Sequence, residues 1–331
     1  MTLLTFSTRL HRRVFALTVA GSAAALLPTL AFSQAYPNKP ISFVVPFAAG
    51  SATDQLARAL GNSITQDTKQ AVIVNDQAGA SGMLAAQFAA KAPADGYTVL
   101  ITTNTTHAAD EHLFKKMPYD PVKDFVPVTG LGKGGQVLVV RPESPYKTVA
   151  DLIADAKKNP GKLSFGSGSS SSRVAGEMLK QLTHTEILHV PYKSNPNALT
   201  DLLGGQITFM ITDTATGVPQ IKGGKLRALG VSTTRRVALL PDVPTLDEAG
   251  VKGYDMGYWF AAYVPAGTPA PVVARLRELL INGTASPAAK TFFETTGSDV
   301  WTTTSEELGK FQHAEAAKWG NVIKAAGIEP E

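Results

Sequence analysis

The sequence contains no cysteine, and this absence removes several classes of protein at once. A disulfide-stapled fold, a thiolate metal site and a lipid anchor attached through cysteine are all excluded. Charged residues make up only 18% of the chain and 44% are hydrophobic, which excludes a disordered chain and a coiled coil. The 331 residues instead indicate a globular protein long enough for two domains.

Long hydrophobic runs are also missing, except for one near the N-terminus. Three arginines precede the apolar run Val14–Phe32, and small residues follow it. This order is typical of a secretory signal, so residues 1–35 are predicted to be a cleaved signal peptide. Cleavage after Ser33 or after Ala35 fits the pattern. The pair Arg12-Arg13 partly matches a twin-arginine signal, so both that route and the Sec route stay open.

The chain has little excess of charge of either sign. Its net charge is +4, from 31 basic and 27 acidic residues. Without the three arginines of the predicted signal, 28 basic residues face the same 27 acidic ones. A chain with nearly equal numbers of basic and acidic residues lacks the basic surface that nucleic-acid binding requires. A nucleic-acid partner is therefore excluded. An exported chain without a lipid anchor predicts a periplasmic protein.

Short hydrophobic runs alternate with helical patterns along the remaining sequence. Runs rich in β-branched residues predict strands, and glycine, proline or polar clusters separate them from the helices. This alternation predicts an α/β protein with a mostly parallel sheet, whose ligands bind at the carboxyl ends of the strands. The predicted strands are 40–46, 71–74, 97–101, 136–140, 163–165, 187–190 and 207–211, and the predicted helices 55–61, 83–91, 148–159, 173–182, 198–203, 271–281 and 305–326.

A short motif occurs twice at corresponding places. Phe47-x-x-Gly50-Ser51 returns as Phe165-x-x-Gly168-Ser169, in each case between a predicted strand and a predicted helix. Free N–H groups and the helix dipole make a helix N-terminus a site for anions. Simple helix capping explains either loop alone. The repetition predicts two similar lobes facing a cleft that binds a carboxylate, with Arg173 as an alternative, side-chain holder of the anion.

Catalytic motifs are scarce. Gly130-x-Gly132-x-x-Gly135 matches a dinucleotide fingerprint, but a predicted strand follows it where a helix is required. The sequence has no nucleophile elbow, P-loop or zinc-protease motif, and His184 and His189 lack a third metal ligand. We therefore expect no catalytic residue, no metal and no cofactor. A hydrolase or isomerase that acts in the same cleft is the alternative of a different class.

Eight segments, taken in their order along the chain, resemble one known family. They are residues 36–41 (YPNKPI), 46–54 (PFAAGSATD), 94–100 (ADGYTVL), 118–121 (PYDP), 189–193 (HVPYK), 201–206 (DLLGGQ), 241–245 (PDVPT) and 265–269 (PAGTP). The sequence thereby resembles the Bug-type periplasmic solute-binding proteins of tripartite tricarboxylate transporters.

The resemblance implies a two-lobed, type II periplasmic-binding-protein-like fold with the ligand cleft between the lobes. It also implies a monomeric receptor, without catalytic chemistry, that passes a small organic carboxylate to the large and small membrane permease subunits. Two chain crossings, near 127–141 and 255–264, predict the division of the chain. Lobe 1 is 36–138 plus 256–331, and lobe 2 is 139–255.

The resemblance and the helix-terminus argument together predict the ligand-binding residues. They are Phe47, Ala48, Gly50, Ser51, Thr53, Asp54, Ala80, Ser81, Gly82, Thr105, Thr106 and His107 in lobe 1, and Ser167, Gly168, Ser169, Ser170, Ser171, Ser172, Arg173, Tyr192 and Asp213 in lobe 2. Rings at Phe47 and Tyr192 favour an aromatic carboxylate or dicarboxylate such as terephthalate. Aliphatic di- or tricarboxylates and acidic amino acids are the alternatives. The hydrolase or isomerase alternative would use Asp54, His107 or Asp213.

Overall fold

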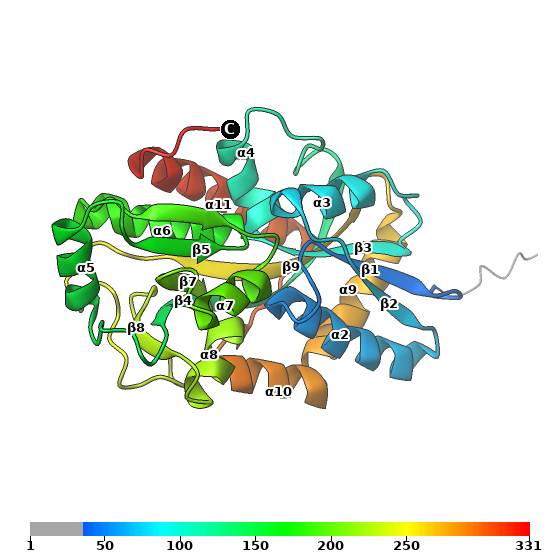
Figure 1. Ribbon diagram of the computed structural model, residues 1–331. Helices are drawn as coiled ribbons and strands as arrows, with labels where there is room; N and C mark the ends of the chain where they lie inside the picture. Colours follow the sequence, from blue (N-terminus) through cyan, green and yellow to red (C-terminus); the bar gives the residue numbers. More distant parts are fainter. Residues whose placement is uncertain (1–35) are drawn as a thin grey trace, which may run out of the picture. The chain divides into compact units, whose positions relative to one another are not determined.

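A mixed ten-stranded sheet runs through residues 36–331, which are the residues that the computed structural model describes. The predicted signal peptide and its cleavage sites lie outside them. The strand order is β2-β1-β3-β9-β4-β7-β5-β6, with β8 and β10 also paired to β4 (Figure 1). The strands are β1 (Ile41–Val45), β2 (Val72–Asp76), β3 (Thr98–Thr103), β4 (Phe125–Val140), β5 (Ser164–Ser167), β6 (Leu188–Pro191), β7 (Phe209–Asp213), β8 (Arg227–Val231), β9 (Gly257–Pro265) and β10 (Asp299–Val300).

Strand β4 belongs to two halves of this sheet. Its residues from Phe125 to Gly135 pair with β9, which lies beside β3. Its residues from Gln136 to Val139 pair with β7, and those from Val137 to Val140 with β8. We call β1, β2, β3, β9, β10 and the first part of β4 the first sheet half, and β5 to β8 with the rest of β4 the second sheet half. One continuous strand therefore joins the two halves.

The expectation of a mostly parallel sheet is correct only away from β4 and β9. The pairs β1–β2, β1–β3, β5–β6 and β5–β7 are parallel. Every pair that includes β4 or β9 is antiparallel. Strand β4 was predicted only from residue 136, because its first part contains four glycines and lacks an apolar run. Its pairing with β9 makes that part a strand.

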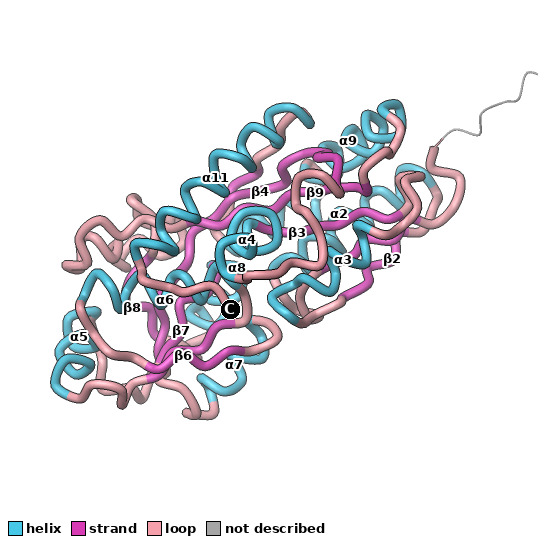
Figure 2. Tube along the Cα trace, turned by 90° about the horizontal axis from the view of Figure 1, so that it is seen from above, coloured by secondary structure: helices cyan, strands magenta, loops and turns pink. Residues whose placement is uncertain are grey.

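Helices cover both faces of the sheet (Figure 1). Seen from above, α11 lies along β4 and α3 lies near β3 (Figure 2). The helices are α2 (Ala52–Thr68), α3 (Met83–Ala90), α4 (Asp110–Leu113), α5 (Val149–Lys158), α6 (Ser170–Thr183), α7 (Asn195–Leu203), α8 (Thr214–Lys222), α9 (Ala270–Thr284), α10 (Pro287–Thr296) and α11 (Ser305–Ala325), with a 3-10 turn η1 at Ala80–Gly82 and a π-helical turn η2 at Thr105–Ala109.

Helices α2 and α6 begin three residues earlier than the sequence patterns indicated. The Ser51 hydroxyl accepts a hydrogen bond from the Asp54 backbone N–H, and Ser169 does the same for Ser172. Serine at the N-cap supplies an acceptor that the first turn otherwise lacks. The serine run after Ser169, which was predicted as a loop, therefore forms the first turn of α6. Capping places the start of each helix directly after a strand.

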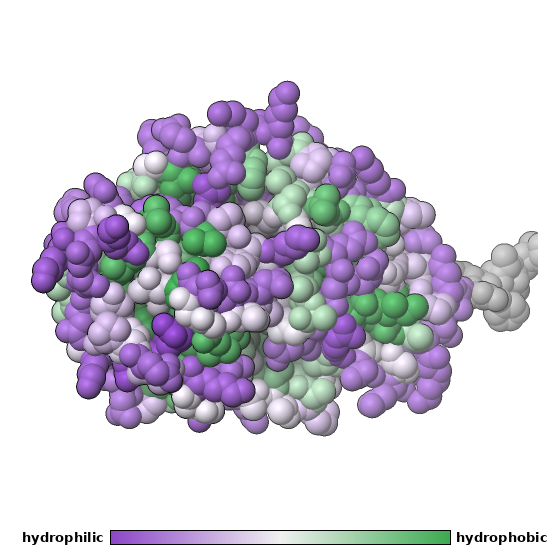
Figure 3. Space-filling model, viewed as in Figure 1, coloured by the Kyte–Doolittle hydropathy of each residue, from purple (hydrophilic) through white to green (hydrophobic). Residues whose placement is uncertain are grey.

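Buried aromatic and aliphatic side chains fill the space between sheet and helices. Phe43 and Phe165 are fully buried in the first and second sheet halves, and Trp259 is 2% exposed. On the surface, hydrophobic residues form separate patches among hydrophilic ones on the face shown in Figure 3. None of the helices within residues 36–331 is both long enough and apolar enough to span a bilayer.

Candidate functional site

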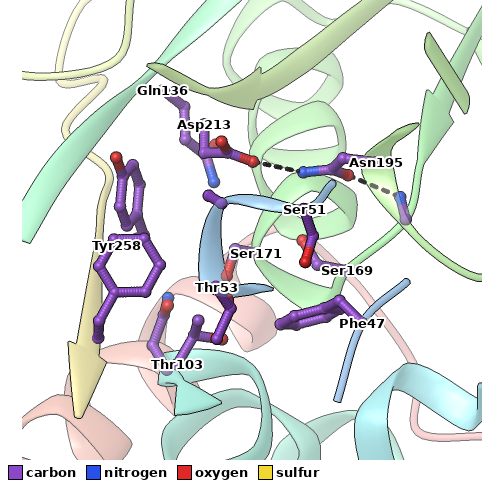
Figure 4. Close-up of a pocket in the computed structure, with 14 residues that line it drawn as sticks. Phe47, Ser51, Thr53, Thr103, Gln136, Ser169, Ser171, Asn195, Asp213 and Tyr258 are labelled. Atoms are coloured by element: carbon purple, nitrogen blue, oxygen red, sulfur yellow. Dashed lines mark hydrogen bonds between the residues drawn. The ribbon is translucent and has the colours of Figure 1, made fainter. Parts of the chain in front are cut away.

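Four helices begin at one cavity between the two sheet halves. Helices α2, α6 and α7 each have a first-turn residue in its wall, and Asp213, the N-cap of α8, also lines it (Figure 4). We call it the inner cavity, and it encloses about 420 Å³ of empty space, part of it open to solvent. Its lining residues are Phe47, Ser51, Ala52, Thr53, Thr103, Asn104, Gln136, Gly168, Ser169, Ser171, Asn195, Asp213, Tyr258 and Phe260.

The helix starts concentrate N–H donors at this cavity. Capping by Ser51 uses the N–H of Asp54, but the N–H groups of Ala52 and Thr53 have no partner within their own helix. In α6 the same holds for Ser170 and Ser171, because Ser169 caps only Ser172. The aligned peptide dipoles add partial positive charge at each helix start. An anion in the inner cavity therefore faces donors without needing a cationic side chain.

Asn195 fixes three of these helix starts relative to one another. Its Oδ1 accepts hydrogen bonds from the Gly168 N–H at 3.0 Å and from the Ser172 hydroxyl at 3.1 Å. Its Nδ2 donates to Asp213 Oδ2 at 2.8 Å (Figure 4). Asp213 Oδ1 in turn accepts from the Thr216 N–H at the start of α8. Asn195 therefore positions the donors of α6, α7 and α8 before any ligand arrives.

Two buried amide side chains in the cavity wall lack partners. Asn104 is fully buried, and neither Nδ2 nor Oδ1 has a hydrogen-bond partner among the described residues. Gln136 is 1% exposed, and its Oε1 is likewise unpaired within residues 36–331. Leaving a buried polar group unpaired costs about 1–3 kcal/mol, so such groups are uncommon away from functional sites. Both amides lie where a polar ligand would pair with them.

The rest of the wall is apolar or already paired. Phe47, Tyr258 and Phe260 contribute rings, and the Tyr258 hydroxyl lies 3.1 Å from the Thr214 hydroxyl. Burial raises the pKa of Tyr258, so this phenol stays neutral. Neither lysine nor arginine is among the described residues that line the cavity, and Asp213 is their only ionisable carboxyl. The wall suits a small ligand that combines a carboxylate with an apolar body.

A second cavity, which we call the outer cavity, shares Ser169 with the inner one. It encloses about 1400 Å³ of empty space, including open solvent. Its walls contain the cations Arg173 and Lys193 and the last residue of the sequence, Glu331. It is lined by Ala80, Ser81, Met83, Phe114, Ser167, Ser169, Arg173, His189, Pro191, Tyr192, Lys193, Asn197 and Glu331.

The predicted site residues divide between these cavities and the interior. Phe47, Ser51, Thr53, Gly168, Ser169, Ser171 and Asp213 line the inner cavity. Ala80, Ser81, Ser167, Arg173 and Tyr192 line the outer cavity, where Ser169 appears again. Ala48, Gly50, Asp54, Gly82, Thr105, Thr106, His107, Ser170 and Ser172 line neither.

Local pairing explains why several predicted residues lie outside both cavities. Asp54 accepts from the Gly50 N–H at 2.7 Å and pairs with Arg58 at 2.7 Å, so the Gly50 amide is not free for a ligand. Ser170 donates to Asp110 Oδ1 at 2.6 Å, and burial raises the pKa of Asp110 well above its ordinary value. Ser172 is used by Ser169 and Asn195, as described above. These residues hold the segments that line the cavities in place, and they do not face the inner cavity themselves.

The turn containing His107 is buried beside the inner cavity. The His107 ring stacks on Tyr263 with centroids 3.9 Å apart, and its Nδ1 lies 2.9 Å from the Thr106 hydroxyl. Burial lowers the pKa of His107 to about 3, so the ring stays neutral at physiological pH. Thr105 comes closest to the predicted role, because its hydroxyl lies 3.3 Å from that of Ser171.

This histidine makes stability depend on pH. Its pKa is lower in the folded than in the unfolded state, so the unfolded chain takes up a proton first and stability falls as the pH drops below about 6.5. Between pH 7 and pH 5 we expect His107 to remove about 2 kcal/mol of stability. Urea unfolding at both pH values, with wild type and His107→Phe, measures this. Between these pH values the free energy of unfolding of His107→Phe should fall by about 2 kcal/mol less than that of wild type. Equal falls in the two proteins would contradict a buried, neutral His107.

The sequence patterns missed seven residues of the inner cavity. The missed residues are Ala52, Thr103, Asn104, Gln136, Asn195, Tyr258 and Phe260. Asn104 directly follows β3, which is the position at which ligand-facing residues of parallel strands occur. Its position therefore indicates a ligand-facing residue, whereas the family resemblance pointed to the next three residues, Thr105, Thr106 and His107. The positions of Gln136, Tyr258 and Phe260 depend on β4 and β9, whose pairing was not predicted.

The described residues contain no group of three or more histidine, aspartate or glutamate side chains placed to hold a metal ion.

Residues 56–328 match the tripartite tricarboxylate transporter family receptor. The chain belongs to this receptor family. Three solved structures resemble the receptor over most of its length. Periplasmic binding protein BugD is 33% identical, with a TM-score of 0.86 over 89% of this chain and 100% of its own.

The other two structures contain ligands. The R. palustris protein Rpa4515 with adipate is 34% identical, with a TM-score of 0.86 over 89% of the receptor and 100% of its own chain. MatC from Rhodopseudomonas palustris with bound malate is 29% identical, with a TM-score of 0.83 over 87% and 100%. These findings confirm the predicted family and the two-lobed periplasmic-binding-protein-like fold. The chain is a solute-binding receptor of a tripartite transporter.

Proposed function

We propose that the receptor captures a small dicarboxylate in the inner cavity and delivers it to the large and small membrane permease subunits for uptake. One observation supports this most directly. Helix starts, the buried Asn104 amide with both polar atoms unpaired, and the unpaired Oε1 of Gln136 line the inner cavity, and none of its described lining residues is a lysine or an arginine. Helix N-termini bind carboxylates through backbone N–H groups. The unpaired Nδ2 of Asn104 then supplies a further hydrogen bond to the carboxylate, whereas the unpaired Oε1 of Gln136 can accept only from a donor group of the ligand, such as a hydroxyl.

The proposed ligand class includes aromatic and aliphatic members. Relatives of known structure hold adipate and malate, which are aliphatic dicarboxylates. The rings of Phe47 and Tyr192 line different cavities, so they do not enclose a single aromatic ring in the inner one. Phe47, Tyr258 and Phe260 still offer an apolar wall there. Terephthalate therefore remains a proposed ligand beside the aliphatic dicarboxylates.

The division into lobes follows the same proposal. Lobe 1 is assigned residues 36–138 plus 256–331 and lobe 2 residues 139–255. The change of β4 partners at Gln136 lies close to one proposed crossing. Hydrogen bonds between Ser170 and Asp110 and between Thr214 and Tyr258 then join the lobes. A ligand that contacts both lobes stabilises this closed arrangement in proportion to its differential affinity.

The remaining proposals concern location and chemistry. The receptor is exported through a cleaved signal peptide, acts in the periplasm as a monomer, and binds its ligand without turnover or cofactor. The inner cavity supports binding without chemistry, because Asp213 already accepts hydrogen bonds from Asn195 and from the Thr216 N–H. The lining Ser171 hydroxyl likewise lies beside another hydroxyl and has no histidine partner.

A thermal-shift screen tests the proposed function. The panel contains succinate, malate, adipate, terephthalate, citrate and aspartate, with adipamide as an uncharged control of matched length. A ligand at about 100 times its Kd stabilises the native state by about 2.7 kcal/mol, which raises Tm by about 5 °C. We expect at least one dicarboxylate to do so and adipamide to have no effect. The absence of any shift contradicts the proposal, and turnover of a bound carboxylate favours the hydrolase or isomerase alternative.

A further inference from the structure

The outer cavity already contains a carboxylate, supplied by the chain itself. Oε1 of Glu331 lies 2.6 Å from Nη2 of Arg173. We propose that the outer cavity is a second carboxylate subsite, which Glu331 occupies in this structure and from which the distal carboxylate of a long dicarboxylate displaces it. This inference rests on the proposed function, because the other carboxylate of the same ligand is held in the inner cavity.

The backbone brings Glu331 to this place. Its N–H donates to the Leu113 carbonyl at 2.9 Å, and its own carbonyl accepts from the Lys115 N–H at 2.8 Å. Glu331 is thus paired with the end of α4 and the segment that follows it, and Figure 1 shows the end of the chain beside α4. The side chain then reaches Arg173, which lies in the first turn of α6. The ion pair therefore joins proposed lobe 1 to proposed lobe 2.

The two partners of this ion pair are not equally buried. The Arg173 side chain is 18% exposed, whereas the Glu331 side chain is 61% exposed. An exposed carboxylate contributes about 0.2–1 kcal/mol in such a pair, so its loss changes little elsewhere. Nε of Arg173 is buried and has no acceptor among the described residues. The guanidinium therefore has a donor, Nε, without an acceptor, and its present carboxylate is replaceable.

The charges of the side chains that line the outer cavity favour an anion once the Glu331 side chain has moved away. Its lining residues then carry the positive charges of Arg173 and Lys193 and no negative one. His189 adds no charge at neutral pH, because burial and then the charges of Arg173 and Lys180 lower its pKa to about 4. Its Nε2 lies 2.7 Å from the Ser167 hydroxyl, which keeps that hydroxyl at the cavity wall. Guanidinium and hydroxyl groups are the usual partners of a carboxylate.

The two cavities adjoin at Ser169. It is the one residue that lines both of them among those that the structure describes. A ligand with one carboxylate at the helix starts of the inner cavity therefore passes Ser169 on its way to Arg173. The chemical class that meets both subsites is an α,ω-dicarboxylate long enough to span them. Monocarboxylates and short dicarboxylates reach only the inner subsite.

Calorimetry with ligands of matched length tests this inference. The probes are succinate, adipate, suberate and hexanoate, which has the carbon number of adipate but a single carboxylate. The variants are Arg173→Gln and Glu331→Gln. The controls are Glu329→Gln, which removes a nearby exposed carboxylate, and Arg275→Gln, which removes a cation from the exposed ion pair with Glu278. Circular dichroism confirms that each variant is folded.

We expect Arg173→Gln to weaken binding of the longer dicarboxylates about 10- to 100-fold, because it removes a charged hydrogen-bond donor. Affinities for succinate and hexanoate should stay within about twofold of wild type. Glu331→Gln should tighten the same longer ligands about two- to fivefold, since it removes the internal competitor. Neither control should alter any affinity by more than about twofold.

The outcomes separate the two proposals. If wild type binds none of the probes and none of the dicarboxylates in the thermal-shift panel, the proposed function fails and the outer subsite fails with it; if it binds only dicarboxylates outside the probes, the outer subsite alone is wrong. If wild type binds dicarboxylates and both Arg173→Gln and Glu331→Gln leave every affinity unchanged, only the outer subsite is wrong. An equal loss for hexanoate and adipate in Arg173→Gln also overturns it. If Arg173→Gln does not fold, the test depends on Glu331→Gln alone, because this exposed position tolerates the change. Unchanged affinity of Glu331→Gln for adipate and suberate then contradicts the outer subsite.

Discussion

Replacing Asn104 with leucine should weaken carboxylate binding about 10- to 150-fold without lowering the stability of the receptor. The side chain of Asn104 is fully buried in the wall of the inner cavity, and both of its polar atoms are unpaired among the described residues. A hydrogen bond to a charged group is worth about 1.5–3 kcal/mol, which corresponds to the predicted loss of affinity. Leucine has the same number of side-chain heavy atoms in the same branching and needs no partner, so the free energy of unfolding should stay constant or rise.

The matched control is Thr102→Val, which removes a buried polar group that is paired. The Thr102 hydroxyl lies 2.6 Å from that of Thr106, and Thr102 is also fully buried. Its loss removes one of the two partners of the buried Thr106 hydroxyl, which keeps His107 Nδ1 at 2.9 Å, so we expect stability to fall by about 0.5–1.5 kcal/mol with little change in affinity. Calorimetric titration and urea unfolding of both variants measure the two effects. Normal binding by Asn104→Leu, together with reduced stability, would show that Asn104 has a structural role only.

Replacing Gly168 with alanine should destabilise the receptor by about 3 kcal/mol or more and abolish binding. A Cβ at this position would lie 1.8 Å from the carbonyl carbon of Ser194 and 2.1 Å from the nitrogen of Asn195. Overpacking in a filled interior usually costs about 1–3 kcal/mol. Here both neighbours are backbone atoms, so no side chain can rotate away. The start of α7 must move, and with it the bonds from Asn195 that position α6 and α8.

Gly309 provides the matched control for this substitution. It lies within α11, where a Cβ would meet only Pro127 at an ordinary distance of 3.8 Å. Alanine is the better helix former, so Gly309→Ala should stabilise the receptor by about 0.5–1 kcal/mol. Chemical denaturation of both variants gives the comparison. The close approach of α7 to Gly168 is refuted if Gly168→Ala unfolds at the wild-type denaturant concentration.

The contrast between Gly50 and Gly168 shows what the repeated motif did and did not predict. Both were predicted to bind the ligand, because both occur in the same Gly-Ser pattern. Gly50 has a φ of +80°, as a turn glycine does, but a Cβ there would have no described atom within 4 Å. Gly168 has the close contacts instead. The motif predicted two helix starts, and the neighbours of each glycine were set by distant segments.

The sequence by itself determined that a helix begins soon after each Gly-Ser pair, although both first residues were predicted three residues late, and it determined the class of ligand that such helix starts suit. Ser51 and Ser169 each cap a helix directly after a strand, and a cap depends only on residues within one turn. Seven predicted residues therefore line the inner cavity. The order of the family segments likewise identified the receptor family and its fold, which the match over residues 56–328 confirms. These conclusions depend on local patterns, which the order of residues contains directly.

Only the tertiary structure decided which polar groups converge. Asn104, Gln136 and Asn195 meet at one cavity because β3, β4 and the start of α7 are brought together by strand pairing and by the packing of α7 on the sheet. The ion pair between Arg173 and Glu331 likewise depends on the chain end pairing with the segment after α4. A residue's local sequence does not encode its distant neighbours. Burial of the whole sheet fixes them, and that burial left the amides of Asn104 and Gln136 facing the inner cavity without partners.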